Sequence, residues 1–310
     1  MTTGTTSRIW CCCRTLPVMS TAPVTVVTGA NSGIGRATAL HLAESGHTVY
    51  ATVRSVSRAG KLLEGAESLG VGVELIELDI AVDNSVRDGF VEIYERAGRI
   101  DHLVNNAGVG GNGVVEETTP ARFAEVFNVD LCGAVRCSQA VLPGMRARGS
   151  GTIVNVTSVV GRFGAIAQAP YVAAKWALEG ASEQMAIELA QFGIRVAIIE
   201  PGITKSSIFG KNLDLPDTSG AYALTYEKML QMYIAGRTHA TDAIEVARVV
   251  RHAIESDDPT LRYPVSWGSE AIISGRQKMS DADWVALGRT ESIHDYITAF
   301  SDVFDLDIGT

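Results

Sequence analysis

From Val24 onward, short apolar runs alternate with longer segments in which apolar residues recur at helical spacing. Short apolar runs bounded by turn residues are typical of strands that are buried on both faces of a sheet. We therefore predict strands at residues 24–29, 47–53, 73–80, 101–108, 151–158 and 194–202.

The segments between these strands show the periodicity of amphipathic helices. The clearest are 36–46, which ends at a glycine, 85–98, a long helix over about 122–147, and 173–193. Strands separated by helices predict a parallel sheet with right-handed crossovers. We expect an α/β fold with a doubly wound parallel sheet, a Rossmann fold, whose ligand lies beyond the carboxyl ends of the strands.

The pattern loosens after Gly202, where 203–220 mixes Gly, Pro, Asp and Ser in the manner of a mobile lid. Two helical stretches follow, near 221–236 and 241–256, and then a short strand candidate at 261–267. The predicted organisation is a disordered leader at 1–22, one Rossmann domain at 23–268 that includes a substrate lid at about 203–236, and a helical C-terminal extension at 269–310.

Composition narrows the class of protein. The chain is 46% hydrophobic and 20% charged, which suits a globular protein, and its net charge of −9 without a basic tract argues against a nucleic-acid partner. No apolar run is long enough to span a bilayer. Three of the five cysteines, Cys11–Cys13, are adjacent and cannot form a disulfide framework, so we expect a cytoplasmic protein. A palmitoylated leader is the alternative interpretation of that cluster.

The segment TGANSGIG, residues 28–35, follows the first strand and opens the first helix. Glycines there allow a sharp turn and a close approach of the backbone to a pyrophosphate, while the helix N-terminus presents N–H groups to the anion. This context favours a dinucleotide site over a simple turn.

The end of the second strand bears on the choice between NAD and NADP. An acid at that position accepts from ribose hydroxyls, but here Val53 is followed by Arg54, whose guanidinium can bind a 2′-phosphate together with the Ser32 hydroxyl. We expect NADP(H) to be preferred, with NAD(H) possible; Arg54 as a plain surface residue is the alternative. Asp79 ends the third strand and either accepts from the adenine amino group or serves as a turn residue.

Three polar residues lie where the sheet would place its reactive edge. Ser158 closes the fifth strand, and Tyr171 and Lys175 are separated by four positions on a predicted helix, which puts them on one face. An ammonium near a phenol lowers the pKa of the phenol towards working pH, where it can transfer a proton. Ser158 would hold the substrate oxygen. No metal-binding cluster is apparent.

These motifs resemble those of the short-chain dehydrogenase/reductase family in its compact one-domain form. TGANSGIG resembles the family's glycine motif, NNAG (105–108) its fourth-strand motif, FNVD (127–130) its helix-asparagine segment, YVAAK (171–175) its active site, and Pro201-Gly202 the turn beside the nicotinamide. The glycine turn, VYATVR and ALEG resemble the branch of 17β-hydroxysteroid and retinol dehydrogenases.

The resemblance implies a catalytic tetrad of Asn128, Ser158, Tyr171 and Lys175, in which Asn128 holds a water of a proton relay through Lys175. It also implies homodimers or homotetramers formed through the helices 122–147 and 173–193. The implied cofactor contacts, in addition to Tyr171 and Lys175, are Gly29, Asn31, Ser32, Gly33, Ile34, Gly35, Arg54, Asp79, Ile80, Asn106, Ala107, Gly108, Pro201, Gly202, Ile203, Thr204 and Ser206.

Residues between Ser158 and Tyr171 should face the substrate and are mostly apolar, which favours a hydrophobic carbonyl compound or alcohol. These are Val159, Val160, Phe163, Ile166 and Gln168. Two other functions fit the motifs less well. A dehydratase or epimerase usually has a larger substrate domain, and an NADP-binding regulatory sensor without turnover typically lacks the Tyr and Lys.

Overall fold

The computed structural model describes residues 21–205 and 219–309, and its centre is a parallel sheet of seven strands. The strand order is β3-β2-β1-β4-β5-β6-β7. Each of the six predicted apolar runs forms a strand, and the candidate at 261–267 provides the seventh. The strands are β1 (Val24–Val27), β2 (Thr48–Val53), β3 (Glu74–Glu77), β4 (His102–Asn105), β5 (Gly151–Val156), β6 (Ile194–Pro201) and β7 (Arg262–Val265).

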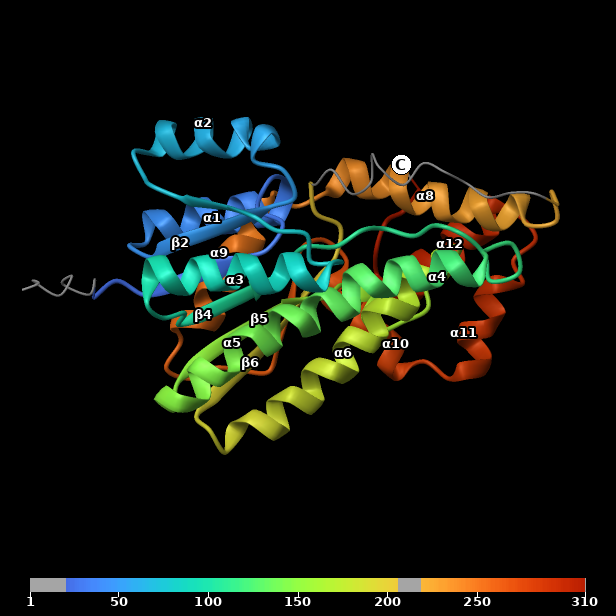
Figure 1. Cartoon of the computed structure of the whole chain (residues 1–310). Coiled ribbons are helices and arrows are strands. Elements are labelled where there is room, and N and C mark those ends of the chain that lie inside the picture. The colour runs from blue at the N-terminus through green and yellow to red at the C-terminus, as the bar shows by residue number, and fades with distance from the viewer. Residues whose placement is uncertain (1–20, 206–218, 310) are drawn as a thin grey trace, which may run out of the picture.

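Helices cover both faces of this sheet, as the uninterrupted burial of β1 and β5 requires (Figure 1). One face packs against α3 (Asp83–Ala97), α5 (Ala134–Arg148) and α6 (Ala169–Ala190) around Phe90, Val141 and Met145. The other face packs against α1 (Gly33–Glu44), α2 (Gly60–Leu69) and α9 (Ala243–Glu255). The predicted doubly wound Rossmann fold is confirmed. Strands β2 and β3 are added on one side of β1 and strands β4 to β7 on the other, so the order of the strands switches between β1 and β4, where such folds bind ligands.

Two details of the helices differ from the sequence prediction. The expected long helix at 122–147 is divided into α4 (Pro120–Phe127), a π-helical turn at Asn128–Gly133, and α5. A π turn inserts an extra residue and rotates the side chains that follow it, which apolar periodicity does not reveal. Helix α2 was not predicted, although its buried residues Leu62 and Ala66 lie four positions apart on one face.

The chain beyond β6 forms a second, smaller packing unit at the carboxyl ends of the strands. Helices α8 (Ala223–His239), α10 (Ser269–Lys278), α11 (Asp281–Gly288) and α12 (Ile293–Phe304) gather there (Figure 1). Phe300 and Phe304 of α12 are buried in one apolar cluster with Val159, Val160 and Phe163. The C-terminal extension therefore supports the segment that was predicted to face the substrate. The predicted leader (except its last two residues) and lid positions 206–218 lie outside the described residues.

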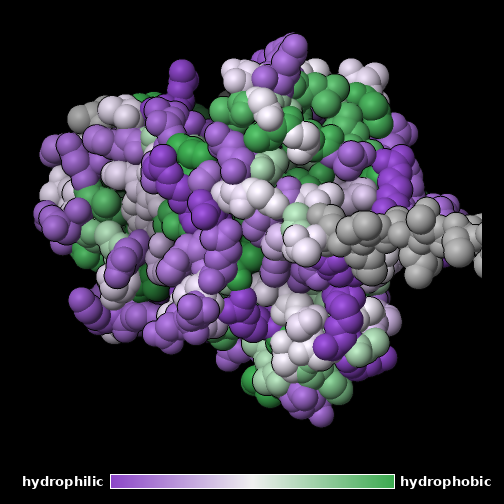
Figure 2. All heavy atoms as spheres, turned by 90° about the vertical axis from the view of Figure 1, so that its left-hand side faces the viewer, coloured by the Kyte–Doolittle hydropathy of each residue, from purple (hydrophilic) through white to green (hydrophobic). Residues whose placement is uncertain are grey.

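The opposite edge, formed by the amino ends of the strands, is covered mostly by hydrophilic side chains (Figure 2). Within residues 21–205 and 219–309, none of the helices has both the length and the apolar character that crossing a membrane demands.

Candidate active site

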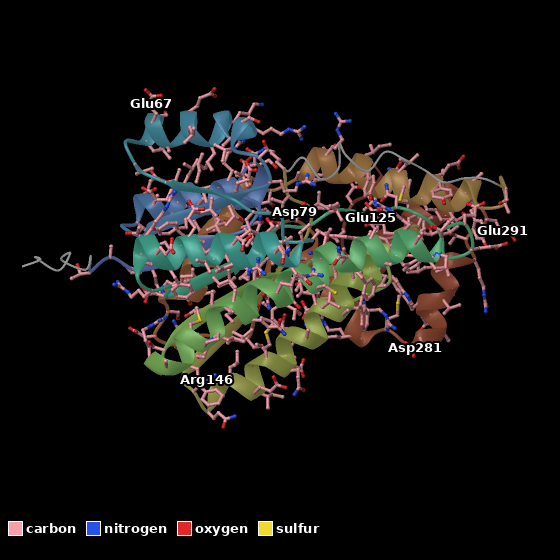
Figure 3. The ribbon with its side chains drawn as sticks, viewed as in Figure 1. Glu67, Asp79, Glu125, Arg146, Asp281 and Glu291 are labelled. Carbon is pink, nitrogen blue, oxygen red and sulfur yellow. The ribbon has the colours of Figure 1, made fainter. Side chains whose placement is uncertain are left out.

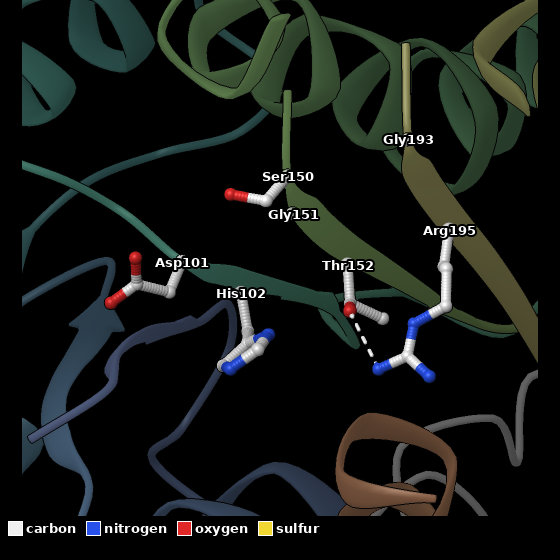
Figure 4. Close-up of a pocket in the computed structure, with 7 residues that line it drawn as sticks. All are labelled: Asp101, His102, Ser150, Gly151, Thr152, Gly193 and Arg195. Atoms are coloured by element: carbon white, nitrogen blue, oxygen red, sulfur yellow. Dashed lines mark hydrogen bonds between the residues drawn. The ribbon is translucent and has the colours of Figure 1, made fainter. Parts of the chain in front are cut away.

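The structure has a pocket at the amino edge of the sheet, whereas the predicted site residues lie at the opposite, carboxyl edge. A pocket of about 230 Å³ at the amino ends is lined by Asp101, His102 and Arg195 among others, and the Arg195 guanidinium donates to the Thr152 hydroxyl at 3.4 Å (Figure 4). None of the predicted site residues lines this pocket. The candidate site therefore lies at the carboxyl edge.

The glycine turn after β1 forms a tight cradle. Gly29 and Gly33 have positive φ angles of 67° and 55°. A Cβ on Gly35 would lie 2.5 Å from the Gly29 carbonyl oxygen and 2.3 Å from the Asn106 side-chain nitrogen, so a larger residue cannot be accommodated there. The buried Oδ1 of Asn31 has no hydrogen-bond partner. A cradle of this shape at a helix N-terminus, with a buried polar atom left unpaired, fits the pyrophosphate of a dinucleotide.

The NNAG segment holds this turn in place. The Asn106 side chain donates to the Thr28 carbonyl at 2.9 Å, and the Thr28 hydroxyl accepts from the Asn106 and Ala107 backbone N–H groups at 3.0 Å each. Asn105 is buried between β4 and β5 and donates to the Asn155 side chain at 2.9 Å. Asn106, which was predicted as a cofactor contact, thus also braces the glycine turn.

Two residues predicted to contact the cofactor, Ile80 and Thr204, instead contact other parts of the protein. Ile80 is buried in the core, where it packs against Gly133, and the Thr204 hydroxyl donates to Ser266 at 2.8 Å. Ser206 lies outside the described residues. The others occupy the loops at the carboxyl edge: Gly29, Asn31, Ser32, Gly33, Ile34 and Gly35 after β1, Arg54 after β2, Asp79 after β3, Asn106, Ala107 and Gly108 after β4, and Pro201, Gly202 and Ile203 at the end of β6.

The residues after β2 and β3 belong to the region expected to hold the adenosine. Arg54 is exposed, while Asp79 is partly buried and its Oδ1 accepts from the Ala81 N–H at 2.9 Å. Figure 3 places Asp79 near the middle of the molecule, away from the left-hand end marked by Glu67 of α2 and Arg146 of α5. Because the Asp79 carboxylate accepts from the Ala81 N–H, it stabilises the turn that follows β3.

Ser158, Tyr171 and Lys175 come together as predicted. Ser158 follows β5; its hydroxyl donates to the Pro201 carbonyl at 3.4 Å and lies close enough to Tyr171 to lower the pKa of the phenol. One helical turn along α6, the Lys175 ammonium lies 5.6 Å from the centre of the Tyr171 ring and donates to the Val156 carbonyl at 3.3 Å. Ser158 and Lys175 are 8% and 4% exposed. The three side chains form one compact polar group at the end of β5.

Burial raises the pKa of the Tyr171 phenol, Lys175 opposes this, and the nearby Asp130 carboxylate adds to it. The net direction in this structure is upward. The expected net lowering by Lys175 is therefore not found, since burial outweighs the ammonium. Burial alone would lower the pKa of Lys175, but the Asp130 carboxylate holds it above its ordinary value.

The structure does not place the Asn128 side chain against Lys175, where the predicted relay would need it. The Asn128 side chain donates to the Ala81 carbonyl at 3.2 Å and accepts from Arg136 at 2.8 Å. The side chain at Lys175 is instead that of Asp130, whose Oδ2 lies 3.3 Å from Nζ. The π turn at Asn128–Gly133 rotates Asp130 towards α6, and the sequence motif FNVD names both residues without distinguishing them.

The predicted substrate residues lie beside this polar group. Val159, Val160 and Phe163 are buried against the C-terminal helices, and Ile166 and Gln168 are partly buried. An apolar groove of about 510 Å³ is lined by Val114, Val172 and the exposed Trp176 among others, and none of the predicted substrate residues lines it. Phe300 and Phe304, which support the predicted substrate residues from α12, could not be recognised from a tail without a motif.

Two curated proteins align with most of the chain. It is 36% identical over 257 residues to retinol dehydrogenase 8 of Bos taurus, an alignment that covers 79% of this chain and 82% of that protein. It is 36% identical over 253 residues to 17-beta-hydroxysteroid dehydrogenase type 1 of Homo sapiens, with coverage of 77% and 76%.

Solved structures agree with these relatives. A short-chain dehydrogenase from Streptomyces avermitilis superposes with a TM-score of 0.76 at 32% identity, covering 87% of this chain and 96% of that one. An alcohol dehydrogenase from the archaeon Thermococcus sibiricus, complexed with 5-hydroxy-NADP, gives a TM-score of 0.66 at 27% identity, with coverage of 79% and 96%.

The sequence profile of the family described as short chain dehydrogenase matches residues 23–215, which include the glycine turn, the NNAG segment and the Ser158, Tyr171 and Lys175 group. This chain belongs to the short-chain dehydrogenase/reductase family and is an NAD(P)-dependent oxidoreductase with a Rossmann fold.

Proposed function

We propose that this protein is an NADP(H)-preferring oxidoreductase that interconverts an apolar carbonyl compound and its alcohol, with Tyr171 as the proton-transfer residue. The observation that carries the proposal is the position of Tyr171 beside both Ser158 and Lys175, at the edge of the sheet that also bears the glycine cradle. A phenol, an ammonium and a hydroxyl held together can bind one substrate oxygen and move one proton.

The nicotinamide would supply or accept the hydride when a dinucleotide is bound. In the reducing direction, the Ser158 hydroxyl holds the carbonyl oxygen and the Tyr171 phenol gives that oxygen its proton. Lys175 stabilises the phenolate that remains, because its ammonium is one helical turn away and is shielded from water. In the oxidising direction, the phenolate removes the proton of the alcohol.

The preference for NADP(H) rests on the loop after β2. Arg54 there is exposed and directly follows Val53, which stands where an acid would repel a 2′-phosphate. Arg58, in the short 3-10 turn at Val56–Arg58, adds a second cation to the same loop. The Thermococcus sibiricus relative is complexed with an NADP derivative, which is consistent with this preference.

The apolar character of the substrate rests on the wall around Ser158 and Tyr171. Val159, Val160 and Phe163 expose 6%, 7% and 5% of their surface and are backed by aromatic side chains of the C-terminal helices. Such a wall favours a hydrophobic compound over a sugar or an acid. The names of the curated relatives, a retinol dehydrogenase and a hydroxysteroid dehydrogenase, indicate substrates of this kind.

The test is a substrate panel with both cofactors. Estrone, 17β-estradiol, all-trans-retinal and retinol are assayed with NADP(H) and NAD(H), following the nicotinamide absorbance. We expect turnover of at least one pair, faster with NADP(H), and loss of that turnover in Tyr171→Phe. Binding of NADPH without turnover of any carbonyl compound or alcohol, in this panel and in a broader one, would instead favour a regulatory sensor.

The protein is further proposed to form homodimers or homotetramers through α4, α5 and α6. Helix α6 exposes 50% of Trp176 and 69% of Ile187, and exposed large apolar side chains of this kind favour association. Light scattering at micromolar concentration tests this proposal, and a monomer would refute it.

A further inference from the structure

A buried carboxylate occupies the centre of the polar group, and the mechanism above does not use it. The side chain of Asp130 is completely buried, and its Oδ2 lies 3.3 Å from the Lys175 ammonium. Asp130 belongs to the π turn between α4 and α5, whereas Lys175 belongs to α6. Buried carboxylates are rare unless they are paired, and this one is paired with a residue of the active site.

Two donors approach Asp130, and they oppose the burial that raises the pKa of its carboxyl group. Oδ1 accepts from the Val109 backbone N–H at 2.7 Å, and Oδ2 faces the Lys175 ammonium. A Cβ on Gly108 would lie 3.2 Å from Oδ2, so the backbone encloses the carboxylate closely. An asparagine here could accept from one of the two donors and would turn its own N–H₂ group towards the other.

The charge of Asp130 affects the pKa of Tyr171 in two ways, directly and through its ion pair with Lys175. Burial raises the pKa of the phenol, Lys175 lowers it, and Asp130 raises it. The other titratable or charged groups that face this cluster are Glu179, one turn beyond Lys175 on α6, Tyr233 from α8, and Arg122 from α4, which acts on Asp130. Asp130 is the carboxylate in direct contact with the Lys175 ammonium, so it weakens the field that would stabilise a phenolate.

We propose that Asp130 is a positioning residue that fixes the Lys175 ammonium, cancels much of its field at Tyr171, and keeps the phenol protonated, so that the site is set for carbonyl reduction over a wide pH range. The inference rests on the proposed function, because it assigns a direction to the same reaction. A protonated phenol is the proton donor for reduction, whereas alcohol oxidation needs the phenolate.

The first experiment follows ionisation of the phenol and needs no substrate. The phenolate absorbance of the full chain is titrated against pH, and the Tyr171→Phe trace is subtracted to isolate Tyr171. The same difference titration is made in Asp130→Asn, with Asp130→Ser as a second neutral variant should the first not fold. We expect the Tyr171 transition to move to lower pH in either variant. A transition that stays in place or moves to higher pH overturns the proposal.

Glu179→Gln is the control, because Glu179, on α6, is another buried carboxylate near the site, but it accepts from the Thr157 hydroxyl at 2.6 Å and pairs with Arg262 at 3.2 Å rather than with Lys175. We expect it to leave the Tyr171 transition in place. A shift as large as that of Asp130→Asn would show that any buried carboxylate has this effect, and would overturn the specific role of Asp130.

The second experiment measures rates against pH with estrone and NADPH for reduction, and with 17β-estradiol and NADP⁺ for oxidation. At the pH where the wild-type reduction rate has begun to fall, we expect reduction by Asp130→Asn to be about threefold slower. Oxidation by that variant should begin at lower pH. Unchanged profiles would contradict the proposal. Absence of turnover with any substrate would instead refute the proposed function, while the titration would still decide the role of Asp130.

Discussion

The ion pair between Lys175 and Asp130 gives a quantitative prediction for stability. The side chains are 6% and 0% exposed and their charged atoms lie 3.3 Å apart. At an effective dielectric constant of about 20, two unit charges at this distance attract each other by about 5 kcal/mol. Lys175→Met removes that attraction and leaves Asp130 buried without a counter-charge. We therefore expect the free energy of unfolding to fall by about 3–5 kcal/mol.

A double-mutant cycle separates this effect from the loss of packing. Asp130→Asn removes the charge that Lys175→Met leaves unpaired, so the double variant should be more stable than the sum of the two single changes predicts, by about 2 kcal/mol or more. Urea denaturation near neutral pH measures all four proteins. Additive changes would refute the argument that the two charges depend on each other.

Lys228→Met provides the control for burying a lysine. Lys228 is 3% exposed, and its ammonium donates to the carbonyls of Gly288 and Thr290 at 3.4 and 2.7 Å. Since these partners carry no full charge and lie on a different part of the chain from Asp130, Lys228→Met and Asp130→Asn should have effects on unfolding that add to within about 0.5 kcal/mol.

Four further predictions address the cofactor site, the chemistry and the response to pH. Tyr171→Phe should keep NADPH binding, measured by fluorescence, and lose turnover by about a hundredfold or more. Gly35→Ala should abolish dinucleotide binding in the same assay, because its Cβ would lie 2.3 Å from the Asn106 side chain. Arg54→Ala should weaken NADPH binding about tenfold and leave NADH binding unchanged. Burial lowers the pKa of His102 to about 4 from 6.5, so the unfolded chain takes up this proton first and urea stability should fall between pH 6.5 and 4; His102→Gln should reduce that slope.

Several parts of the fold could be predicted from local patterns alone. The apolar runs at 24–29 and 151–158 became β1 and β5, since strands buried on both faces must be continuously apolar. The glycines of 28–35 fixed the cradle after β1, because a positive φ at Gly29 and Gly33 excludes most other residues. The unpredicted helix α2 marks the limit of this approach, since a helix of ten residues that buries only Leu62 and Ala66 is easily overlooked in the sequence.

The wall behind the site depended on contacts between distant segments. Phe300 and Phe304 lie about 140 residues from Val159 and Val160 in sequence, yet they are buried in one cluster. Local spacing predicts a helical tail, but it carries no information about the surface against which that tail packs.

Helical periodicity by itself determined that Tyr171 and Lys175 share one face, since residues four positions apart on a helix always do. Only the tertiary structure decided which polar side chain of FNVD meets that lysine. Asn128 and Asp130 are two residues apart, and a change in helical hydrogen bonding from i+4 to i+5 turns one towards Arg136 and the other towards α6. Gly133 of this turn packs closely against Ile80, and a contact between segments about 50 residues apart leaves no trace in a local pattern.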